Sequence, residues 1–412
     1  MKIADMAGKS ILILGYGKEG KTTEKFLRKN IPNCNITISD KSIDGNYLDQ
    51  QAKFDIVIKT PSIPKREMKV PYTTATNIFF ANKGTQTVIG VTGTKGKSTT
   101  ASLIAHIIKD SGRTVYLIGN IGVPALSVFE HELENDAIFV YEFSSYQLDD
   151  IKYSPEISVV VSLFPDHINY HGSVEKYYLA KKNILSCATS NSIFAYNPKY
   201  TELGKWAKEF KGRSITVATD YSIKNTNLVG PHNIENIQLA VVVVRQMGIS
   251  DEISRGAIES FQPLSHRLEI IGVHNKVTYI DDAISTTPES TIAALNSFQN
   301  IQTILLGGED RGYKFDNLAL ELAKKEVEFL VLFPDSGDKI NEAVEKIKTF
   351  NPEIFETSSM EDAVKFCVEK TNYGMVCMLS SASPSYSLWK DFNEKGDQFQ
   401  EFVKKYAKEY KK

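Results

Sequence analysis

Val88-Ile89-Gly90-Val91-Thr92-Gly93-Thr94-Lys95-Gly96-Lys97-Ser98-Thr99 is the most informative stretch of this chain. An apolar run typical of a buried strand leads into a glycine-rich loop, and residues 101–110 then have the apolar spacing of a helix. A strand, a glycine loop and a helix in this order form a phosphate-binding loop, in which backbone N–H groups surround phosphate oxygens. Lys97 can reach the outer phosphates of a nucleotide, and the Ser98 hydroxyl can bind Mg²⁺. The usual pattern has a glycine at the position of Val91, so we predict a shortened loop. The predicted ATP-binding residues of this loop are Gly93, Thr94, Lys95, Gly96, Lys97, Ser98 and Thr99.

On both sides of this loop, short apolar runs alternate with helical stretches, which is typical of parallel α/β domains. The predicted strands are 10–14, 36–38, 56–58, 88–91, 115–117, 138–140, 159–161, 277–280, 303–306, 329–332 and 375–379. Further helices are predicted at 20–29, 174–187, 233–247 and 253–260. A polar segment at 82–86 and a helix-breaking segment at 261–264 divide the chain into predicted domains 1–83, 84–263 and 264–412. The predicted fold class is α/β, with a Rossmann-like N-terminal domain, a central P-loop-type ATPase domain with a mostly parallel sheet, and a Rossmann-like C-terminal domain.

Composition excludes some classes of protein. The 412 residues are 42% apolar and 24% charged, with a formal net charge of -2, so the chain lacks the basic excess that binds nucleic acid. Apolar stretches such as 239–244 fall far short of the ~18 residues that a membrane helix needs. The four cysteines are scattered and form no Cys-x-x-Cys pair, which is typical of reduced thiols. We therefore expect a cytoplasmic protein that binds neither nucleic acid nor membrane.

A second glycine loop lies near the N-terminus. Gly15-Tyr16-Gly17-Lys18-Glu19-Gly20 is a G-x-G-x-x-G sequence between a predicted strand and helix, and Asp40 follows at the end of the next strand. Taken alone, this pattern indicates NAD or FAD, with the acid on the ribose. The glycines could equally form a tight turn that places another phosphate-bearing ligand on the helix N-terminus. Both interpretations stay open on these residues alone.

Polar residues at strand ends could complete a metal site. Glu142 ends the strand 138–141, and Asp166-His167 follow the strand near 159–163. Ligands collect at the carboxyl edge of a parallel sheet, and Mg²⁺ held by one serine needs a carboxylate. A single strand-end glutamate is nevertheless more often a surface or capping residue, and a single histidine is more often structural.

In combination, these motifs resemble the Mur ligases. The resemblance includes the phosphate loop, Glu142-Phe143-Ser144-Ser145-Tyr146-Gln147-Leu148 and Asp166-His167-Ile168-Asn169-Tyr170-His171-Gly172. It continues in order through 119–122, 177–181, 230–236 and His266-Arg267, and so covers nearly the whole chain. It implies an enzyme that phosphorylates a carboxylate with ATP and then joins it to an amino acid through the acyl phosphate.

The resemblance also implies catalytic and metal-binding residues. Lys97, Glu142, His167 and Lys181 would be catalytic. Two Mg²⁺ ions are implied, the first on Ser98 and Glu142 and the second on Glu142, His167 and a carbamate on Lys181. The family pattern Tyr-x-x-Ala-Lys fits 177–181, which favours Lys181 and predicts a solvated Lys182.

The same resemblance assigns substrate sites. ATP would also contact Asn233, Asn236, Arg267 and Asp282, although helix capping is an alternative for the asparagines. The N-terminal loop would take UDP in place of a dinucleotide, through Tyr16, Gly17, Lys18, Asp40, Lys41 and Asn120. Thr286, Arg311, Ser385, Tyr386 and Phe392 would bind the amino acid.

The N-terminal loop and Ser380-Ser381-Ala382-Ser383-Pro384-Ser385 resemble the branch of the family that adds glutamate to UDP-N-acetylmuramoyl-L-alanine in peptidoglycan precursor synthesis. Ile284 stands where the family usually has a lysine near the amino-acid site, and Ser62 where it usually has a glycine. D-glutamate is therefore the expected acceptor, and L-glutamate the alternative. A nicotinamide-dependent oxidoreductase and a non-catalytic ATP-binding scaffold are the alternatives from other classes. A monomer is expected.

Overall fold

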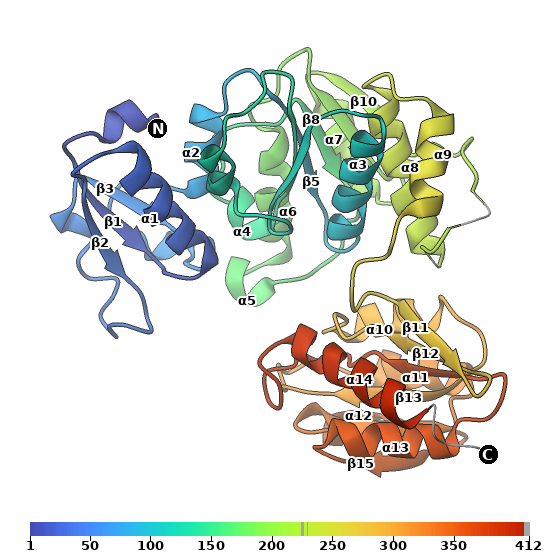
Figure 1. Cartoon of the computed structure of the whole chain (residues 1–412). Coiled ribbons are helices and arrows are strands. Elements are labelled where there is room, and N and C mark those ends of the chain that lie inside the picture. The colour runs from blue at the N-terminus through green and yellow to red at the C-terminus, as the bar shows by residue number, and fades with distance from the viewer. Residues whose placement is uncertain (224–225, 229, 408–412) are drawn as a thin grey trace. The chain divides into compact units, whose positions relative to one another are not determined.

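The computed structural model describes residues 1–223, 226–228 and 230–407, which divide into two compact units (Figure 1). The first unit comprises Met1–Thr226 and Glu235–Phe261, and the second comprises Asn227–Ile234 and Gln262–Lys412. Three sheets occupy these units, and the helices lie between their strands in the sequence. Within the described residues, no helix is both long and apolar enough to cross a membrane.

The first sheet has four parallel strands in the order β2-β1-β3-β4. Its elements are η1 (Ile3–Met6), β1 (Ser10–Leu14), α1 (Lys18–Asn30), β2 (Asn35–Ser39), η2 (Gln51–Lys53), β3 (Ile56–Lys59), η3 (Lys65–Glu67), β4 (Tyr72–Thr73) and α2 (Ala75–Asn82). Four of the five residues of β1 are buried, since this strand lies between β2 and β3. The chain leaves β1 toward β2 on one side and returns to β3 on the other. The loop after β1 therefore opens at a point where the strand order reverses, the usual ligand position in such sheets.

The second sheet has six parallel strands in the order β10-β9-β8-β5-β7-β6. Its strands are β5 (Thr87–Thr92), β6 (Val115–Gly119), β7 (Ile138–Glu142), β8 (Ile157–Val160), β9 (Ile193–Tyr196) and β10 (Arg213–Thr216). Its helices are α3 (Lys97–Asp110), η4 (Ala125–Glu130), α4 (Ser145–Leu148), α5 (Ile168–His171), α6 (Val174–Lys182), η5 (Asn183–Leu185), α7 (Thr201–Glu209), α8 (Pro231–Arg245) and α9 (Asp251–Ser260). The connections from β5 and β8 leave in opposite directions, which puts the phosphate loop at a second reversal of strand order.

The third sheet, in the second unit, has the order β11-β12-β16-β13-β14-β15. Its strands are β11 (Glu269–His274), β12 (Val277–Asp281), β13 (Ile301–Gly307), β14 (Phe329–Phe333), β15 (Glu353–Glu356) and β16 (Val376–Leu379). The helices are α10 (Pro288–Leu295), α11 (Asp316–Lys324), α12 (Ser336–Glu345), α13 (Met360–Lys370) and α14 (Phe392–Tyr406). Only β11 pairs antiparallel, because a tight turn joins it directly to β12. The buried apolar strands β13, β14 and β16 form the centre of this sheet.

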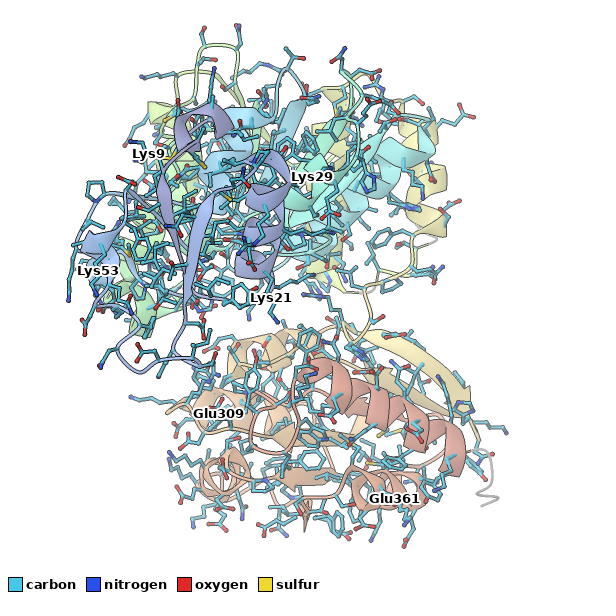
Figure 2. The ribbon with its side chains drawn as sticks, turned by 60° about the vertical axis from the view of Figure 1, so that its left-hand side comes forward. Lys9, Lys21, Lys29, Lys53, Glu309 and Glu361 are labelled. Carbon is cyan, nitrogen blue, oxygen red and sulfur yellow. The ribbon has the colours of Figure 1, made fainter. Side chains whose placement is uncertain are left out.

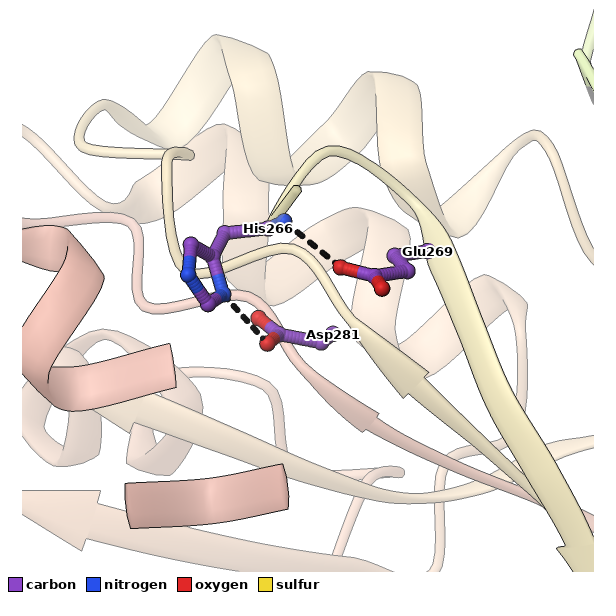
Figure 3. Close-up of side chains that lie close together, drawn as sticks. All are labelled: His266, Glu269 and Asp281. Carbon is purple, nitrogen blue, oxygen red and sulfur yellow. Dashed lines mark hydrogen bonds and ion pairs between the residues drawn. The ribbon is translucent and has the colours of Figure 1, made fainter. Parts of the chain in front are cut away.

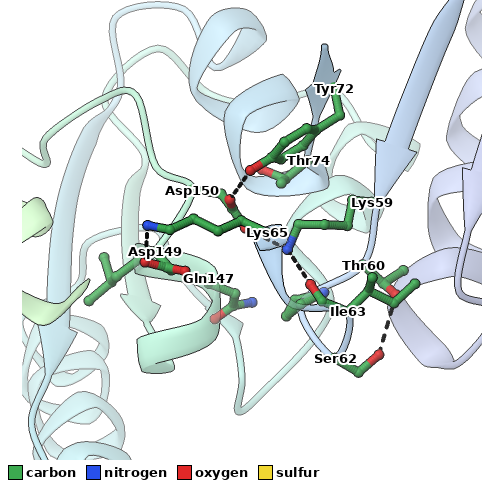
Figure 4. Close-up of polar contacts among 12 residues, drawn as sticks. Lys59, Thr60, Ser62, Ile63, Lys65, Tyr72, Thr74, Gln147, Asp149 and Asp150 are labelled. Atoms are coloured by element: carbon green, nitrogen blue, oxygen red, sulfur yellow. Dashed lines mark hydrogen bonds and ion pairs between the residues drawn. The ribbon is translucent and has the colours of Figure 1, made fainter. Parts of the chain in front are cut away.

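The two sheets of the first unit are held together by buried polar contacts as well as by apolar packing (Figure 4). Lys59, at the end of β3, forms a 2.5 Å ion pair with Asp150, and their side chains are 0% and 2% exposed. The Lys59 ammonium also donates to the Ile63 carbonyl, and the Tyr72 hydroxyl donates to Asp150. Lys29, at the end of α1, donates to two backbone carbonyls of η4, and Figure 2 labels this lysine among the charged side chains of the first unit.

The predicted α/β class with mostly parallel sheets is confirmed, and each sheet falls within one predicted domain. The boundaries 83/84 and 263/264 stay predictions. The helix predicted at 174–187 is wrong at its end, because α6 stops at Lys182 and a 3-10 turn follows. Two tertiary hydrogen bonds redirect the chain there: the Asn183 amide donates to the Leu148 carbonyl, and the Ser158 hydroxyl donates to the Ile184 carbonyl.

Candidate active site

The phosphate loop joins β5 to α3 and begins at the carboxyl edge of the second sheet. Gly93 and Gly96 have φ angles of 155° and 81°, which a residue with a side chain rarely adopts. A Cβ on Gly96 would lie 2.6 Å from Oδ1 of Asn236 and 2.8 Å from Cγ1 of Val161. The loop backbone therefore packs too closely against its neighbours for any residue but glycine. The helix starts at Lys97, earlier than its apolar spacing indicates, because the left-handed Gly96 forms its N-cap.

Side chains from the segment after β8 and from α6 hold this loop in place. The Lys95 backbone N–H donates to the Ser162 hydroxyl at 2.8 Å. The Thr94 hydroxyl donates to the Phe164 carbonyl at 3.0 Å and accepts from the Tyr177 hydroxyl at 3.0 Å. These hydrogen bonds connect the phosphate loop to the segment after β8 and to α6, and so set its position.

Glu142 ends β7 and is completely buried. Its Oε1 accepts a 2.8 Å hydrogen bond from the Asn120 amide. Its Oε2 is also buried, and no residue in the described part of the chain gives it a hydrogen bond. A buried carboxylate oxygen without a donor is costly, and a cation would remove that cost. The structure thus brings Asn120, predicted for the UDP substrate, to the predicted metal ligand Glu142.

Lys181 lies on α6 and is 1% exposed. Its ammonium group donates to the Gly93 carbonyl at 2.7 Å and lies 4.8 Å from the centre of the Tyr177 ring. Burial, followed by the positive charge of Lys97, holds the pKa of Lys181 well below its usual value. Its neighbour Lys182 is 37% exposed and pairs with Glu209 at 2.6 Å. The burial of the two lysines agrees with the predicted register.

His167 precedes α5 and has a left-handed backbone, with φ of 51°. Its Nδ1 lies 2.9 Å from the Tyr146 hydroxyl, and its backbone N–H donates to Asp166. Burial lowers the pKa of His167, and the charges of Lys97 and Lys181 lower it further. The Tyr177 ring has its centre 6.1 Å from that of the His167 ring and 4.8 Å from the Lys181 ammonium group, so His167 and Lys181 both border this tyrosine.

The N-terminal glycine loop forms the second predicted site of this unit. The Tyr16 backbone N–H donates to Asp40 at 2.7 Å, and Asp40 also accepts two hydrogen bonds from Ser42. These bonds, led by that from the Ser42 hydroxyl, lower the pKa of Asp40 and keep it anionic. Gly17 is the N-cap of α1, and Lys18 is the first helical residue. Lys41, next to Asp40, is exposed. The loop after β1 and the end of β2 thus come together as predicted.

The remaining predicted ATP contacts are divided between the units. Asn236 belongs to the first unit, beside Gly96, whereas Asn233, Arg267 and Asp282 belong to the second. Asn233 is buried and lies in the first turn of α8, which begins at Pro231. The capping alternative for the two asparagines stays a prediction. Burial raises the pKa of Asp282 to about 7, and the Ser380 hydroxyl donates to its carboxylate at 2.8 Å.

The predicted amino-acid residues all lie in the second unit. Arg311 pairs with Glu309 at 2.8 Å and covers the Tyr386 ring at 5.6 Å. The Ser385 hydroxyl is buried, without a hydrogen-bond partner in the described residues. Phe392 begins α14 with its ring against that of His266. Thr286 lies partly buried just before Thr287, the N-cap residue of α10. Arg311 thus has the internal partner Glu309, which a carboxylate ligand would have to replace.

A buried cluster in the second unit escaped the sequence analysis (Figure 3). The ligand atoms of His266, Glu269 and Asp281 lie within 4.8 Å of one another, the only such group of three among the described residues. The Gln400 amide donates to both carboxylates, and His266 Nδ1 lies 2.7 Å from Asp281. This hydrogen bond to Asp281 raises the pKa of His266. Because Arg267 and Asp282 are the next residues along the chain, the cluster fixes the backbone of two predicted ATP contacts.

The comparisons with known proteins agree with this geometry. The Mur ligase middle domain matches residues 91–227, and the Mur ligase, glutamate ligase domain matches residues 266–383. A UDP-N-acetylmuramoylalanine--D-glutamate ligase of Clostridium tetani is 30% identical over 93% of this chain and 90% of its own length. The chain belongs to the Mur ligase family.

Further Mur ligases resemble this chain. A UDP-N-acetylmuramoylalanine--D-glutamate ligase of Natranaerobius thermophilus is 29% identical over 95% of this chain and 97% of its own length. Among solved structures, MurF ligase from Thermotoga maritima in complex with ADP has a TM-score of 0.63 at 15% identity, covering 98% of this chain and 97% of its own. UDP-N-acetylmuramate-alanine ligase MurC from the same organism has a TM-score of 0.64 at 17% identity, covering 98% of this chain and 100% of its own. These two likenesses concern the fold.

In this Mur ligase, two residues that contact predicted site residues or motifs could not be identified from the sequence. Tyr146 lies inside the motif at 142–148, but its hydrogen bond with His167 joins residues that are 21 positions apart in the sequence. Lys395, completely buried on α14, donates to the Ser381 hydroxyl, and burial lowers its pKa to about 7. Its position three residues after Phe392 was the only available signal, since a lysine within a polar helix normally indicates a solvated face.

Proposed function

We propose that this chain is an ATP-dependent ligase that joins D-glutamate to UDP-N-acetylmuramoyl-L-alanine and releases ADP and phosphate. Relatives that match over nearly their whole length, which include two described above, are UDP-N-acetylmuramoylalanine--D-glutamate ligases, and this supports the substrate pair. The observation that carries the proposal is the convergence of Lys97, Glu142, His167 and Lys181 around the end of β5. A scaffold that only bound ATP would not need this set, and a nicotinamide enzyme would not need the phosphate loop.

The proposed reaction has two steps. An oxygen of the L-alanyl carboxylate attacks the γ-phosphorus of ATP, the bond from that phosphorus to the β–γ bridging oxygen breaks, and ADP leaves. The amine of glutamate then attacks the acyl phosphate carbonyl, loses a proton, and phosphate leaves with the former carboxylate oxygen. In the first step an anion approaches an anion, so the ammonium group of Lys97 lowers the barrier by offsetting the charge.

The residues present fit a divalent cation, because Glu142 Oε2 is a buried anionic oxygen without a protein donor among the described residues. Ser98, Glu142, His167 and a carbamate on Lys181 would hold two Mg²⁺ ions. When bound, the ions neutralise phosphate charge as carboxylate and triphosphate meet. The depressed pKa of Lys181 supports the carbamate, because only the neutral amine reacts with CO₂.

Substrate recognition is proposed for the other predicted residues. The glycine loop after β1, with Asp40 and Lys41, would bind the UDP part of the substrate at the N-terminus of α1. Asn233, Asn236, Arg267 and Asp282 would bind ATP together with the phosphate loop. Arg311 would bind a glutamate carboxylate by exchanging its internal partner Glu309, with Thr286, Ser385, Tyr386 and Phe392 around the acceptor. Adding the glutamate would be a step of peptidoglycan precursor synthesis in the cytoplasm, by a monomer.

The test is phosphate release and product mass with UDP-N-acetylmuramoyl-L-alanine and a panel of amino acids. We expect turnover with D-glutamate, none with alanine or lysine, and none in Lys97→Ala. Lys182→Ala is the matched control, because its ammonium group lies on the surface and pairs with Glu209. Preference for L-glutamate would establish the second candidate, which is considered because Ile284 stands where the family usually has a lysine near the amino-acid site. Normal release by a folded Lys97→Ala would contradict the proposal.

A further inference from the structure

His167 contacts Tyr146, and Tyr146 in turn stacks on Tyr170. Tyr146 belongs to α4 and Tyr170 to α5, and their rings stack with centres 3.9 Å apart and planes 28° apart. The Tyr146 hydroxyl lies 2.9 Å from Nδ1 of His167, with the two rings edge to face. The two short helices are also joined by His171, whose Nε2 lies 3.0 Å from the Ser145 hydroxyl.

The stacked tyrosines are themselves anchored to the loop after β3. The Tyr170 hydroxyl donates to the Pro61 carbonyl at 2.9 Å, and the Arg66 guanidinium donates to the Tyr170 carbonyl at 2.6 Å. Lys65 of the same loop pairs with Asp149, the residue after α4. Hydrogen bonds to Tyr170 and the ion pair at Asp149 thus hold both helices that carry the stacked tyrosines. The Tyr146 hydroxyl is thereby positioned beside His167.

A hydrogen bond at one ring nitrogen decides what the other nitrogen can do. A neutral imidazole has one N–H and one lone pair, so an N–H at Nδ1 leaves the lone pair at Nε2. A histidine that binds a metal generally donates its other N–H to an oxygen, which fixes both the tautomer and the ring orientation. The Tyr146 hydroxyl oxygen lies within hydrogen-bond distance of His167 Nδ1.

We propose that Tyr146 is the positioning residue of His167: Nδ1–H donates to the Tyr146 hydroxyl oxygen, and the lone pair is thereby kept on Nε2, the nitrogen that would bind the metal. Nε2 lies 3.7 Å from an oxygen of Asp166. The inference rests on the proposed function, in which His167 is a ligand. It also gives the motif at 142–148 a second role, because this segment supplies the Glu142 carboxylate and the group that orients the histidine. No bond forms or breaks in this role.

The variant Tyr146→Phe tests the proposal, because it removes the hydroxyl and keeps the stack on Tyr170. Its matched control is Tyr170→Phe, which loses the bond to Pro61 and leaves the contact to His167 in place. ¹⁵N NMR of histidine-labelled protein reads the tautomer directly, and the His167 signals are identified by their loss in His167→Gln. Electron paramagnetic resonance of Mn²⁺ with ADP reads metal affinity without turnover.

We expect the Nδ1–H tautomer in the unaltered protein, its loss in Tyr146→Phe, and Mn²⁺ affinity about 10-fold to 100-fold weaker in that variant. Tyr170→Phe should keep both the tautomer and the affinity. An Nε2–H tautomer in the unaltered protein would overturn the inference, as would unchanged Mn²⁺ affinity in Tyr146→Phe with weakened affinity in His167→Gln. If His167→Gln binds Mn²⁺ normally, the metal role of His167 itself fails, and the inference with it.

Discussion

Lys181 and Lys182 show how one helical register separates a buried side chain from a surface one. Lys181 is buried against the phosphate loop, whereas Lys182 meets Glu209 at the surface. The resemblance of 177–181 to the family pattern Tyr-x-x-Ala-Lys predicted which lysine is buried, and helical periodicity explains only why two neighbouring residues lie on different faces. The depressed pKa of Lys181 could not be predicted, because it depends on burial by segments distant in the sequence.

For this pair we predict that Lys181→Ala loses nearly all phosphate release, since the site loses a buried cation or its carbamate. Small carboxylates such as formate or acetate should restore part of the activity by occupying the place of the carbamate. Lys182→Ala should remain close to the unaltered enzyme. The initial rate of phosphate release, with and without added acetate, measures both. If Lys182→Ala lost phosphate release and Lys181→Ala kept it, the predicted register would be wrong.

Glu19 is a residue whose ionisation opposes folding. It lies in the first turn of α1, where its Oε2 accepts from the Gln147 amide at 3.3 Å and its Oε1 is buried without a donor among the described residues. Burial raises the pKa of Glu19 from 4.5 to about 7. A raised carboxyl pKa has no effect on stability when both states are protonated, and it destabilises the fold as pH rises from about 4.5 to about 7.

Glu19→Gln should therefore unfold like the unaltered protein near pH 4.5 and be more stable above pH 7, by up to about 3 kcal/mol. Urea unfolding at several pH values measures this difference. Glu24→Gln is a control of opposite sign, because the Tyr16 hydroxyl lowers the pKa of Glu24 and its charge favours folding above about pH 4.5. If the free energy of unfolding of Glu19→Gln depends on pH in the same way as that of the unaltered protein, the raised pKa of Glu19 is refuted.

Among the elements, the end of β3 and the segment after α4 are joined by the ion pair of Lys59 with Asp150. Removing one partner of a buried pair leaves an uncompensated charge, which typically costs 3–5 kcal/mol. Lys59→Met should therefore destabilise the first unit by about that amount, and Lys59→Met with Asp150→Asn should recover part of it. Lys65→Met, at the 56% exposed partner of Asp149, should cost about 1 kcal/mol or less. Midpoints of urea unfolding compare the three, and equal losses in Lys59→Met and Lys65→Met would contradict this account.

Element prediction succeeded where strands were both buried and apolar. β1, β3, β13 and β14 were found because nearly all their residues face a core. The strands β4, β10, β11 and β15 were missed, because their apolar signal is short or interrupted by polar residues. The four-residue β9 was also missed, although its central residues Phe194 and Ala195 are apolar and buried. In the candidate site, the residues at strand ends were predicted from the sequence. The contacts of Tyr146 and Lys395 were not, because they join elements that are distant in the sequence.

At the scale of the whole molecule, three sheets were predictable from the alternation of strands and helices, but their strand orders were not. The sequence alone does not show that β5 lies between β7 and β8, and this pairing is what brings Glu142 and the phosphate loop together. The glycine loop after β1 likewise left two ligands possible, because both place a phosphate on a helix N-terminus.

UDP should therefore stabilise the first unit, and NADH should not. A ligand at 100 times its Kd adds about 2.7 kcal/mol to the stability of the state that binds it. We expect UDP to raise the urea midpoint and slow cleavage of the first unit by trypsin, with NADH at the same concentration leaving both unchanged. Protection by NADH but not by UDP would favour an oxidoreductase.

The central claim is that the enzyme activates a carboxylate as an acyl phosphate. UDP-N-acetylmuramoyl-L-alanine carrying ¹⁸O in its L-alanyl carboxylate tests this claim, with unlabelled water, ATP and D-glutamate as the other reactants. Mass spectrometry of the released phosphate then follows one oxygen atom. The account predicts one ¹⁸O per phosphate, because the carboxylate oxygen that attacks the γ-phosphorus leaves with it when the amide forms. Unlabelled phosphate, released at the same rate as the amide product, would contradict it.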